Sequence, residues 1–148
     1  MNSRVLVVED EPITGEMLRQ ALEKESIDVT LAPDGPTALR GMEPGKYDLV
    51  VLDLKLPGMS GDQVLEELRK SDPFVEVIVY TNYEEPPVMK NLYRLGVNDY
   101  IRKGADADLW KTVEAIKARL DPFSAEKGDQ VLKAVPPGLL RPDHPPKE

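Results

Sequence analysis

Residues 49–53 constrain the fold of this chain more than any other stretch. Leu49 to Leu52 are apolar at every position, and Asp53 follows them directly. A strand that is apolar on both faces is typical of a parallel sheet covered by helices on both sides. A carboxylate at the end of such a strand is costly to bury unless it is paired or bound to a metal. The sequence therefore predicts Asp53 at the carboxyl edge of a parallel sheet, where open α/β sheets bind their ligands.

The residues after Asp53 predict how the chain leaves this edge. Pro57-Gly58 fits the two central positions of a type II turn. Ser60 is a candidate N-cap for a helix that begins at Gly61. We therefore expect a short loop between the strand and the next helix, with Asp53 in front of it.

The rest of the chain alternates between strand and helix patterns. Apolar β-branched runs and apolar residues at helical spacing indicate the two kinds of element. Five such alternations predict one α/β domain with a doubly wound parallel sheet and right-handed crossovers. The predicted strands cover residues 4–8, 27–31, 49–52, 75–80 and 97–101, and the predicted helices cover residues 12–22, 37–42, 61–70, 84–95 and 106–120.

The composition changes after residue 121, which suggests a domain over 1–121 and a C-terminal extension over 122–148. Six of the fourteen prolines lie in the extension, and residues 124–135 have the pattern of a short helix. No recognisable output domain follows. The chain is therefore either a stand-alone protein or a piece of a longer one, and the sequence leaves both open.

Charge and composition exclude several classes of function. The net charge of −8 argues against direct nucleic-acid binding through a broad basic surface. The chain has no cysteine, so we expect neither disulfides nor thiol chemistry. The N-terminal residues lack a signal-peptide pattern, and no apolar run approaches the ~18 residues that a membrane-spanning helix needs. We expect a cytoplasmic protein without a membrane segment.

Chemically useful side chains follow four of the five strands: Glu9 and Asp10, then Asp53, Thr81 and Lys103. In a parallel sheet the carboxyl ends of the strands share one edge, so these side chains can converge. Three neighbouring carboxylates repel one another, and Mg²⁺ suits a few carboxylates completed by water and phosphate oxygens. With the hydroxyl and the ammonium, they describe a site that stabilises a phosphoryl group on Asp53.

Two neighbouring cations, Arg102 and Lys103, compete for the place at the end of the fifth strand. Side chains alternate along a strand, so Arg102 lies on the face of Tyr100 and Lys103 on the opposite face. We expect Lys103 to be the cation of the site.

The sequence resembles the receiver domain of bacterial two-component response regulators, of the chemotaxis-regulator type. Five motifs in a suitable order and spacing carry the resemblance, which covers residues 4 to 120. They are Val-Val-Glu-Asp-Glu at 7–11, Asp-Leu-Val-Val-Leu-Asp at 48–53, Leu-Pro-Gly-Met-Ser-Gly at 56–61, Tyr-Thr at 80–81 and Gly-Val-Asn-Asp-Tyr-Ile-Arg-Lys at 96–103.

The resemblance implies a flavodoxin-like (βα)5 sandwich with sheet order 2-1-3-4-5, and a signalling switch rather than an enzyme. It implies phosphotransfer to Asp53 from a sensor histidine kinase or phosphotransfer protein, with Thr81 and Lys103 as phosphoryl partners. Tyr100 would be the aromatic switch residue. Phosphorylation would then change the shape of the face formed by the fourth helix, the fifth strand and the fifth helix. Through this face the protein would form a homodimer or bind an unidentified downstream protein. The implied Mg²⁺ ligands are Glu9, Asp10, Asp53 and the backbone carbonyl of Lys55.

The sequence departs from the family pattern at three places. Gly104 replaces the proline that usually follows the lysine, so we expect a trans peptide bond and a looser loop there. Asn82 replaces a very small residue and narrows the entry of the phosphodonor. Lys55 and Tyr83 occupy the two positions that tune the attack of water on the acyl phosphate. Our hypothesis is that both shield the phosphoryl group and slow its loss.

Three other readings compete with a phosphorylated receiver. A pseudo-receiver with the same fold would never be phosphorylated and would serve as a protein-interaction module. An aspartyl-phosphate phosphohydrolase typically needs a second acid two residues after the nucleophile, where this chain has Lys55. A flavin-binding protein would want a hydroxyl- and glycine-rich loop after the first strand, where Glu-Asp-Glu-Pro would repel a phosphate.

Overall fold

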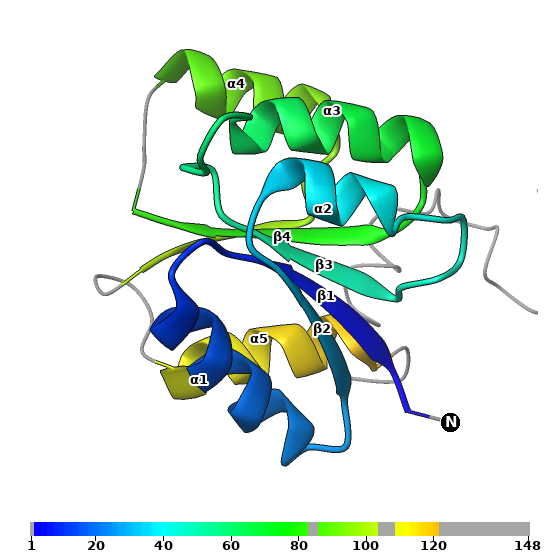
Figure 1. The fold of residues 1–148 in the computed structure, drawn as a ribbon, viewed down its shortest axis with the longest axis vertical. Helices are drawn as coiled ribbons and strands as arrows, with labels where there is room; N and C mark the ends of the chain where they lie inside the picture. Colours follow the sequence, from blue (N-terminus) through cyan, green and yellow to red (C-terminus); the bar gives the residue numbers. More distant parts are fainter. Residues whose placement is uncertain (1, 83–85, 104–108, 122–148) are drawn as a thin grey trace, which may run out of the picture.

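A computed structural model describes residues 2–82, 86–103 and 109–121 of the chain. Its centre is a sheet of five parallel strands in the order β2-β1-β3-β4-β5, with helices on both faces (Figure 1). The predicted α/β fold and the 2-1-3-4-5 strand order are therefore confirmed. The predicted helix over residues 124–135 lies outside the described residues.

The elements alternate along the chain as the sequence predicts. The strands are β1 (Arg4–Val8), β2 (Asp28–Ala32), β3 (Leu49–Leu52), β4 (Glu76–Thr81) and β5 (Asp99–Arg102). The helices are α1 (Pro12–Glu23), α2 (Gly35–Arg40), α3 (Gly61–Ser71), α4 (Pro86–Arg94) and α5 (Leu109–Leu120). None of the described helices is long and apolar enough to cross a membrane.

The central strand β3 is apolar throughout because it contacts helices on both faces. Leu49 and Val51 point into the cluster that contains Leu18 of α1 and Ile116 of α5. The alternate residues of β3 point into the opposite cluster, which is built with α2, α3 and α4. Figure 1 shows α1 and α5 below the sheet and the other three helices above it. All four β3 residues are at most 1% exposed.

The start of α2 differs from the sequence-based expectation by two residues. The helix begins at Gly35 and not at Thr37, because Asp34 is its N-cap and accepts the backbone N–H of Thr37 at 2.8 Å. Pro36 then lies in the first turn, where the missing N–H costs nothing. An aspartate two residues before a proline is a helix-start signal, because the carboxylate can cap the helix and the proline fits its first turn.

The loop between β3 and α3 has the predicted geometry. Gly58 has a φ of +78°, as the third residue of a type II turn requires. Ser60 occupies the N-cap position of α3, and its backbone N–H donates to the Gln63 side chain at 3.1 Å. The chain therefore turns sharply after Asp53 and enters α3 at a defined place.

Arg69 of α3 ties the end of α4 to the rest of this helical layer. Its guanidinium donates to the carbonyl oxygens of Leu95 at 3.0 Å and Gly96 at 2.8 Å, and to that of Val75 at 2.6 Å. Gly96, with a φ of +78°, follows α4 in the left-handed conformation that often ends a helix. Burial lowers the pKa of Arg69, and the nearby charges of Asp72 and Glu76 oppose this effect.

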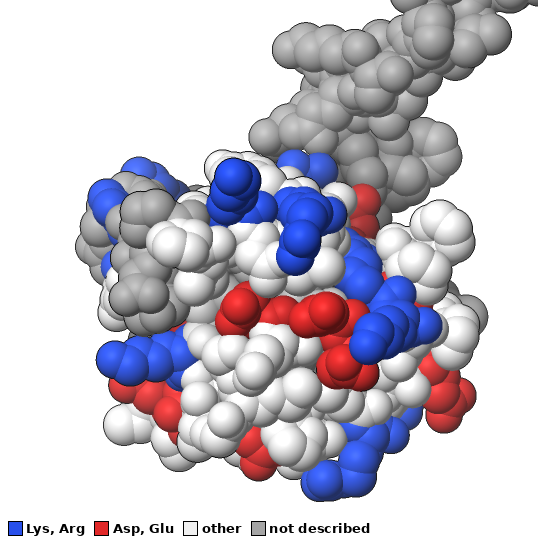
Figure 2. Space-filling view, turned by 90° about the horizontal axis from the view of Figure 1, so that it is seen from above, with Lys and Arg blue, Asp and Glu red and all other residues white. Residues whose placement is uncertain are grey.

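Charges of both signs lie on the face made by α3 and α4. The acidic residues of α3 include Asp62 and Glu66, and the basic residues of α4 include Lys90 and Arg94. Figure 2, seen from this side, shows acidic and basic side chains interspersed. The part of this face that the structure describes therefore offers no broad basic surface of the kind that attracts a phosphate backbone.

Candidate functional site

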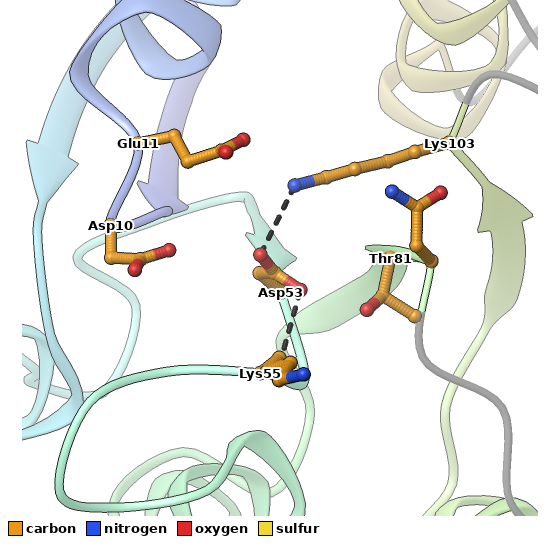
Figure 3. Close-up of a pocket in the computed structure, with 7 residues that line it drawn as sticks. Asp10, Glu11, Asp53, Lys55, Thr81 and Lys103 are labelled. Atoms are coloured by element: carbon orange, nitrogen blue, oxygen red, sulfur yellow. Dashed lines mark hydrogen bonds and ion pairs between the residues drawn. The ribbon is translucent and has the colours of Figure 1, made fainter.

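A pocket of about 350 Å³ lies at the carboxyl edge of the sheet. Its walls come from the ends of β1, β3, β4 and β5, which the strand order places beside one another (Figure 3). The residues that line it are Asp10, Glu11, Asp53, Lys55, Thr81, Asn82 and Lys103. The structure thus brings together side chains that the sequence places up to 93 positions apart, from Asp10 to Lys103.

Asp53 is held on both sides of its carboxylate. Its backbone N–H continues the β1–β3 ladder by donating to the Val8 carbonyl at 3.0 Å. Its Oδ1 accepts the backbone N–H of Lys55 at 3.2 Å, and its Oδ2 lies 3.1 Å from the Lys103 ammonium. The side chain is 8% exposed. A carboxylate so oriented can present an oxygen to an incoming electrophile without rearranging its backbone.

Gly61 determines how the loop after Asp53 packs beneath the pocket. A Cβ at this position would lie 2.4 Å from the Cα of Leu54 and 2.6 Å from the carbonyl oxygen of Asp53. The Gly61 N–H donates to the Leu54 carbonyl at 2.8 Å. Only a glycine allows this approach of α3 to the loop. The sequence pattern predicts Gly61 only as the start of a helix and does not reveal this packing requirement.

Lys103 reaches across the sheet edge from β5 to the carboxylates of β3 and β1. Its ammonium lies 2.7 Å from Glu9 Oε1 and 5.4 Å from the centre of the Tyr80 ring. The side chain is 13% exposed, and its backbone N–H donates to the Thr81 carbonyl at 3.0 Å. Lys103, and not Arg102, is therefore the cation that contacts Asp53.

Burial and charge act in opposite directions on the two ends of this ion pair. Burial raises the pKa of the Glu9 carboxyl, while the Lys103 ammonium and the N–H of Glu11 oppose that rise. Burial lowers the pKa of the Lys103 ammonium, but the bond to Glu9 and the charge of Asp53 outweigh it, so the pKa ends above its usual 10.5. Lys103 is therefore positively charged at neutral pH.

Glu9, Asp10 and Asp53 form an acidic group in which one carboxylate oxygen from each lies within 4.8 Å of the others. Glu9 and Asp53 are buried, and Asp10 is exposed. Carboxylates this close repel one another by about 3.5 kcal/mol per pair at an effective dielectric constant near 20. Hard oxygen donors of this kind, open to solvent on one side, fit a divalent cation such as Mg²⁺.

The other predicted residues lie in or behind the pocket. Thr81 is fully buried at the end of β4 and lines the pocket, and Asn82 lines it next to Thr81. Lys55 is exposed at the rim. Tyr100 is half-buried and packs against the core cluster above the sheet, away from the pocket lining. Tyr83 and Gly104 lie outside the described residues.

A scan against family models matches residues 5–114 to the response regulator receiver domain. This chain belongs to the response regulator receiver family. Receiver domains are the signalling switches of response regulators, which is the class that the sequence motifs predicted. The family assignment and the α/β architecture therefore agree.

Curated relatives place this receiver beside transcriptional and sensory regulators. The chain is 35% identical over 133 residues to "Sensory transduction protein RegX3" of Mycobacterium bovis, covering 89% of this chain and 58% of that protein. It is 33% identical over 150 residues to "Alkaline phosphatase synthesis transcriptional regulatory protein PhoP" of Bacillus subtilis, covering 97% and 62%. The chain thus spans about three-fifths of the length of these relatives.

Solved structures of receiver domains have the same fold. A CheY-like receiver from Methanospirillum hungatei superposes with a TM-score of 0.77 at 28% identity, covering 88% of this chain and 99% of that one. The non-phosphorylated HemR receiver domain from Leptospira biflexa superposes with a TM-score of 0.75 at 27% identity, covering 81% and 95%.

Proposed function

We propose that this receiver is phosphorylated on Asp53 in a Mg²⁺-dependent reaction, with a phosphohistidine of a sensor kinase or phosphotransfer protein as donor. The observation that carries the proposal is the contact of Lys103 with Asp53 beside the acidic group of Glu9, Asp10 and Asp53. A nucleophilic carboxylate, a fixed cation and a cluster of oxygen donors are what phosphoryl transfer to a carboxylate needs.

In the proposed reaction an Asp53 oxygen attacks the phosphorus while the phosphorus–nitrogen bond of the donor breaks. The imidazole leaves, and the phosphoryl group remains on Asp53. Lys103 would balance charge on the phosphoryl oxygens, and the hydroxyl of Thr81 would donate to one of them. Bound Mg²⁺ would supply further charge neutralisation, held by Glu9, Asp10, Asp53 and the Lys55 carbonyl.

A protein donor also fits the surface beside the pocket. A shallow apolar groove lies on α1, directly after the acidic residues that follow β1. It is lined by Pro12, Ile13, Glu16, Met17 and Gln20. Ile13 is 76% exposed and Met17 is 51% exposed. Large exposed apolar residues next to a reactive site favour a protein partner over a free small molecule.

The proposed switch passes through Tyr100 to the face of α4, β5 and α5. Tyr93 of α4 and Trp110 of α5 are 71% and 63% exposed on these two helices. We propose this face for the downstream contact or a homodimer, within a protein that acts in the cytoplasm. Phosphorylation would bias this face between two states.

The test is intact-mass spectrometry after incubation with acetyl phosphate, with and without Mg²⁺. We expect a gain of one phosphoryl group in the wild type that is absent in Asp53→Asn and absent without Mg²⁺. Asp62→Asn, a carboxylate of α3 outside the pocket, is the matched control and should gain the group normally. If the wild type neither gains the phosphoryl group nor binds beryllium fluoride, the proposal fails. The chain would then be a pseudo-receiver that serves as a protein-interaction module.

A further inference from the structure

The strand before Lys103 and the type of residue after it both bear on the position of this lysine. Strand β5 ends at Arg102, and the Lys103 N–H makes the bond to Thr81 that continues the β4–β5 pairing. The next residue is Gly104, where the family pattern has a proline. Glycine restricts the backbone least and proline most. The contacts of the Lys103 side chain therefore bear on how far its ammonium reaches.

Glu9 makes the shorter of the two ionic contacts of Lys103. The ammonium lies 2.7 Å from Glu9 and 3.1 Å from Asp53. The side chain of Glu9 is also the less exposed of the two, at 3% against 8% for Asp53. It belongs to the end of β1, so the lysine spans the ends of β4 and β3 to reach it.

Glu9 is itself held firmly enough to act as an anchor. Its Oε2 accepts the backbone N–H of Glu11 at 3.2 Å, and its own N–H donates to the Ala32 carbonyl at 3.0 Å. Its side-chain carbons lie against α1 at Gly15, where an added Cβ would lie 3.8 Å from Glu9 Cγ. Both carboxylate oxygens are therefore engaged, one by the backbone and one by Lys103.

We propose that Glu9 is the positioning residue for Lys103, and that it takes over the task that a proline after the lysine performs elsewhere in the family. By sharing the ammonium, Glu9 keeps Lys103 from pairing with Asp53 alone and holds it where a phosphoryl group on Asp53 would need it. This inference rests on the proposed function. It assigns Glu9 a role beyond adding charge to the acidic group.

The length of the Glu9 side chain distinguishes the two roles. An aspartate at this position keeps the negative charge but is one carbon–carbon bond, about 1.5 Å, shorter. Glu9→Asp should therefore preserve the charge that a cation requires and lose the contact with Lys103. Glu9→Gln keeps the length and a hydrogen-bond acceptor but removes the charge. It should therefore retain the contact with Lys103 and lose the charge that a cation requires.

The first readout separates cation binding from phosphorylation rate. Mg²⁺ affinity is titrated by intrinsic fluorescence, and the rate with acetyl phosphate is measured at saturating Mg²⁺. For Glu9→Asp we expect a smaller loss of Mg²⁺ affinity than for Glu9→Gln, but a rate at saturating Mg²⁺ that is lower by roughly tenfold to a hundredfold, because misplacement by about 1 Å can cost this much. For Glu9→Gln we expect the larger loss in Mg²⁺ affinity.

The second readout is the dependence of this effect on Lys103. In a Lys103→Met background, Glu9→Asp should cause no additional loss of rate, since the group that Glu9 positions is gone. A wild-type rate for Glu9→Asp, or an equal loss with and without Lys103, would overturn the proposal.

The third readout needs neither metal nor phosphorylation. In EDTA, the ammonium protons of a lysine held between two carboxylates exchange slowly enough to be detected by two-dimensional NMR. We expect this signal of Lys103 in the wild type and in Asp53→Asn, and its loss in Glu9→Asp. The opposite pattern would refute the anchoring role. If the wild type gains no phosphoryl group, the proposed function fails, and this spectrum still decides whether Glu9 holds Lys103.

Discussion

Replacing Lys103 with methionine should destabilise the metal-free protein and strengthen its binding of Mg²⁺. Methionine has a similar length and no charge, so the change removes the ammonium from Glu9 and Asp53 while filling most of its space. These two acids have 3% and 8% of their side chains exposed. They would then face each other and Asp10 with no cation between them.

The size of the effect follows from the contacts that are lost. Removing one partner of a buried ion pair costs about 3–5 kcal/mol. The pocket is open to solvent on one side, so we expect the lower end, a loss of about 3 kcal/mol in the free energy of unfolding. In Lys103→Met, Mg²⁺ no longer competes with the ammonium of Lys103 for the carboxylates. A tenfold gain in Mg²⁺ affinity would recover about 1.4 kcal/mol of that loss at saturation.

Urea unfolding in EDTA and in saturating Mg²⁺ measures both effects, with a Mg²⁺ titration of the folded protein beside it. Lys117→Met is the matched control, because it breaks the ion pair of Lys117 with Glu25, whose side chains are 39% and 31% exposed. An exposed pair contributes little, so this control should change stability far less and respond to Mg²⁺ as the wild type does. Equal stability of both variants in EDTA, or an unchanged Mg²⁺ affinity of Lys103→Met, would contradict the reasoning.

Three further predictions concern the surroundings of the site. Lys55→Ala should shorten the lifetime of the phosphoryl group, measured by its loss from the purified phosphoprotein, because Lys55 lines the pocket rim; an unchanged lifetime would end the shielding hypothesis. Gly61→Ala should lower both the unfolding midpoint and the phosphorylation rate, since its Cβ would lie 2.4 Å from the Leu54 Cα. Hydrogen bonds from Thr37 hold the pKa of Asp34 below its ordinary 3.8, so its contribution to stability is present above that pH and is lost as the pH falls further. Asp34→Asn should lack this acid-dependent loss in urea unfolding at low pH.

Sequence periodicity was sufficient for the order and type of the elements. Strand β1 has the predicted bounds, and the β3 residues alternate between the two cores because both faces of a parallel sheet are covered. The errors lie at element ends, as at Gly35, where one cap hydrogen bond shifts the start of a helix. Such bonds depend on single side chains, to which a periodic pattern is insensitive.

The sequence by itself determined that acids, a hydroxyl and a cation stand at the ends of four of the five parallel strands. The alternation of side chains along the fifth strand also predicted Lys103, and not Arg102, as the cation of the site. Only the tertiary structure decided which of these groups touch. The Glu9–Lys103 contact joins residues 94 positions apart and depends on the register of four strands. The close approach of Gly61 to Leu54 depends on how α3 packs over the loop. Local patterns specify elements, whereas contacts between elements arise only when their register and packing are fixed together.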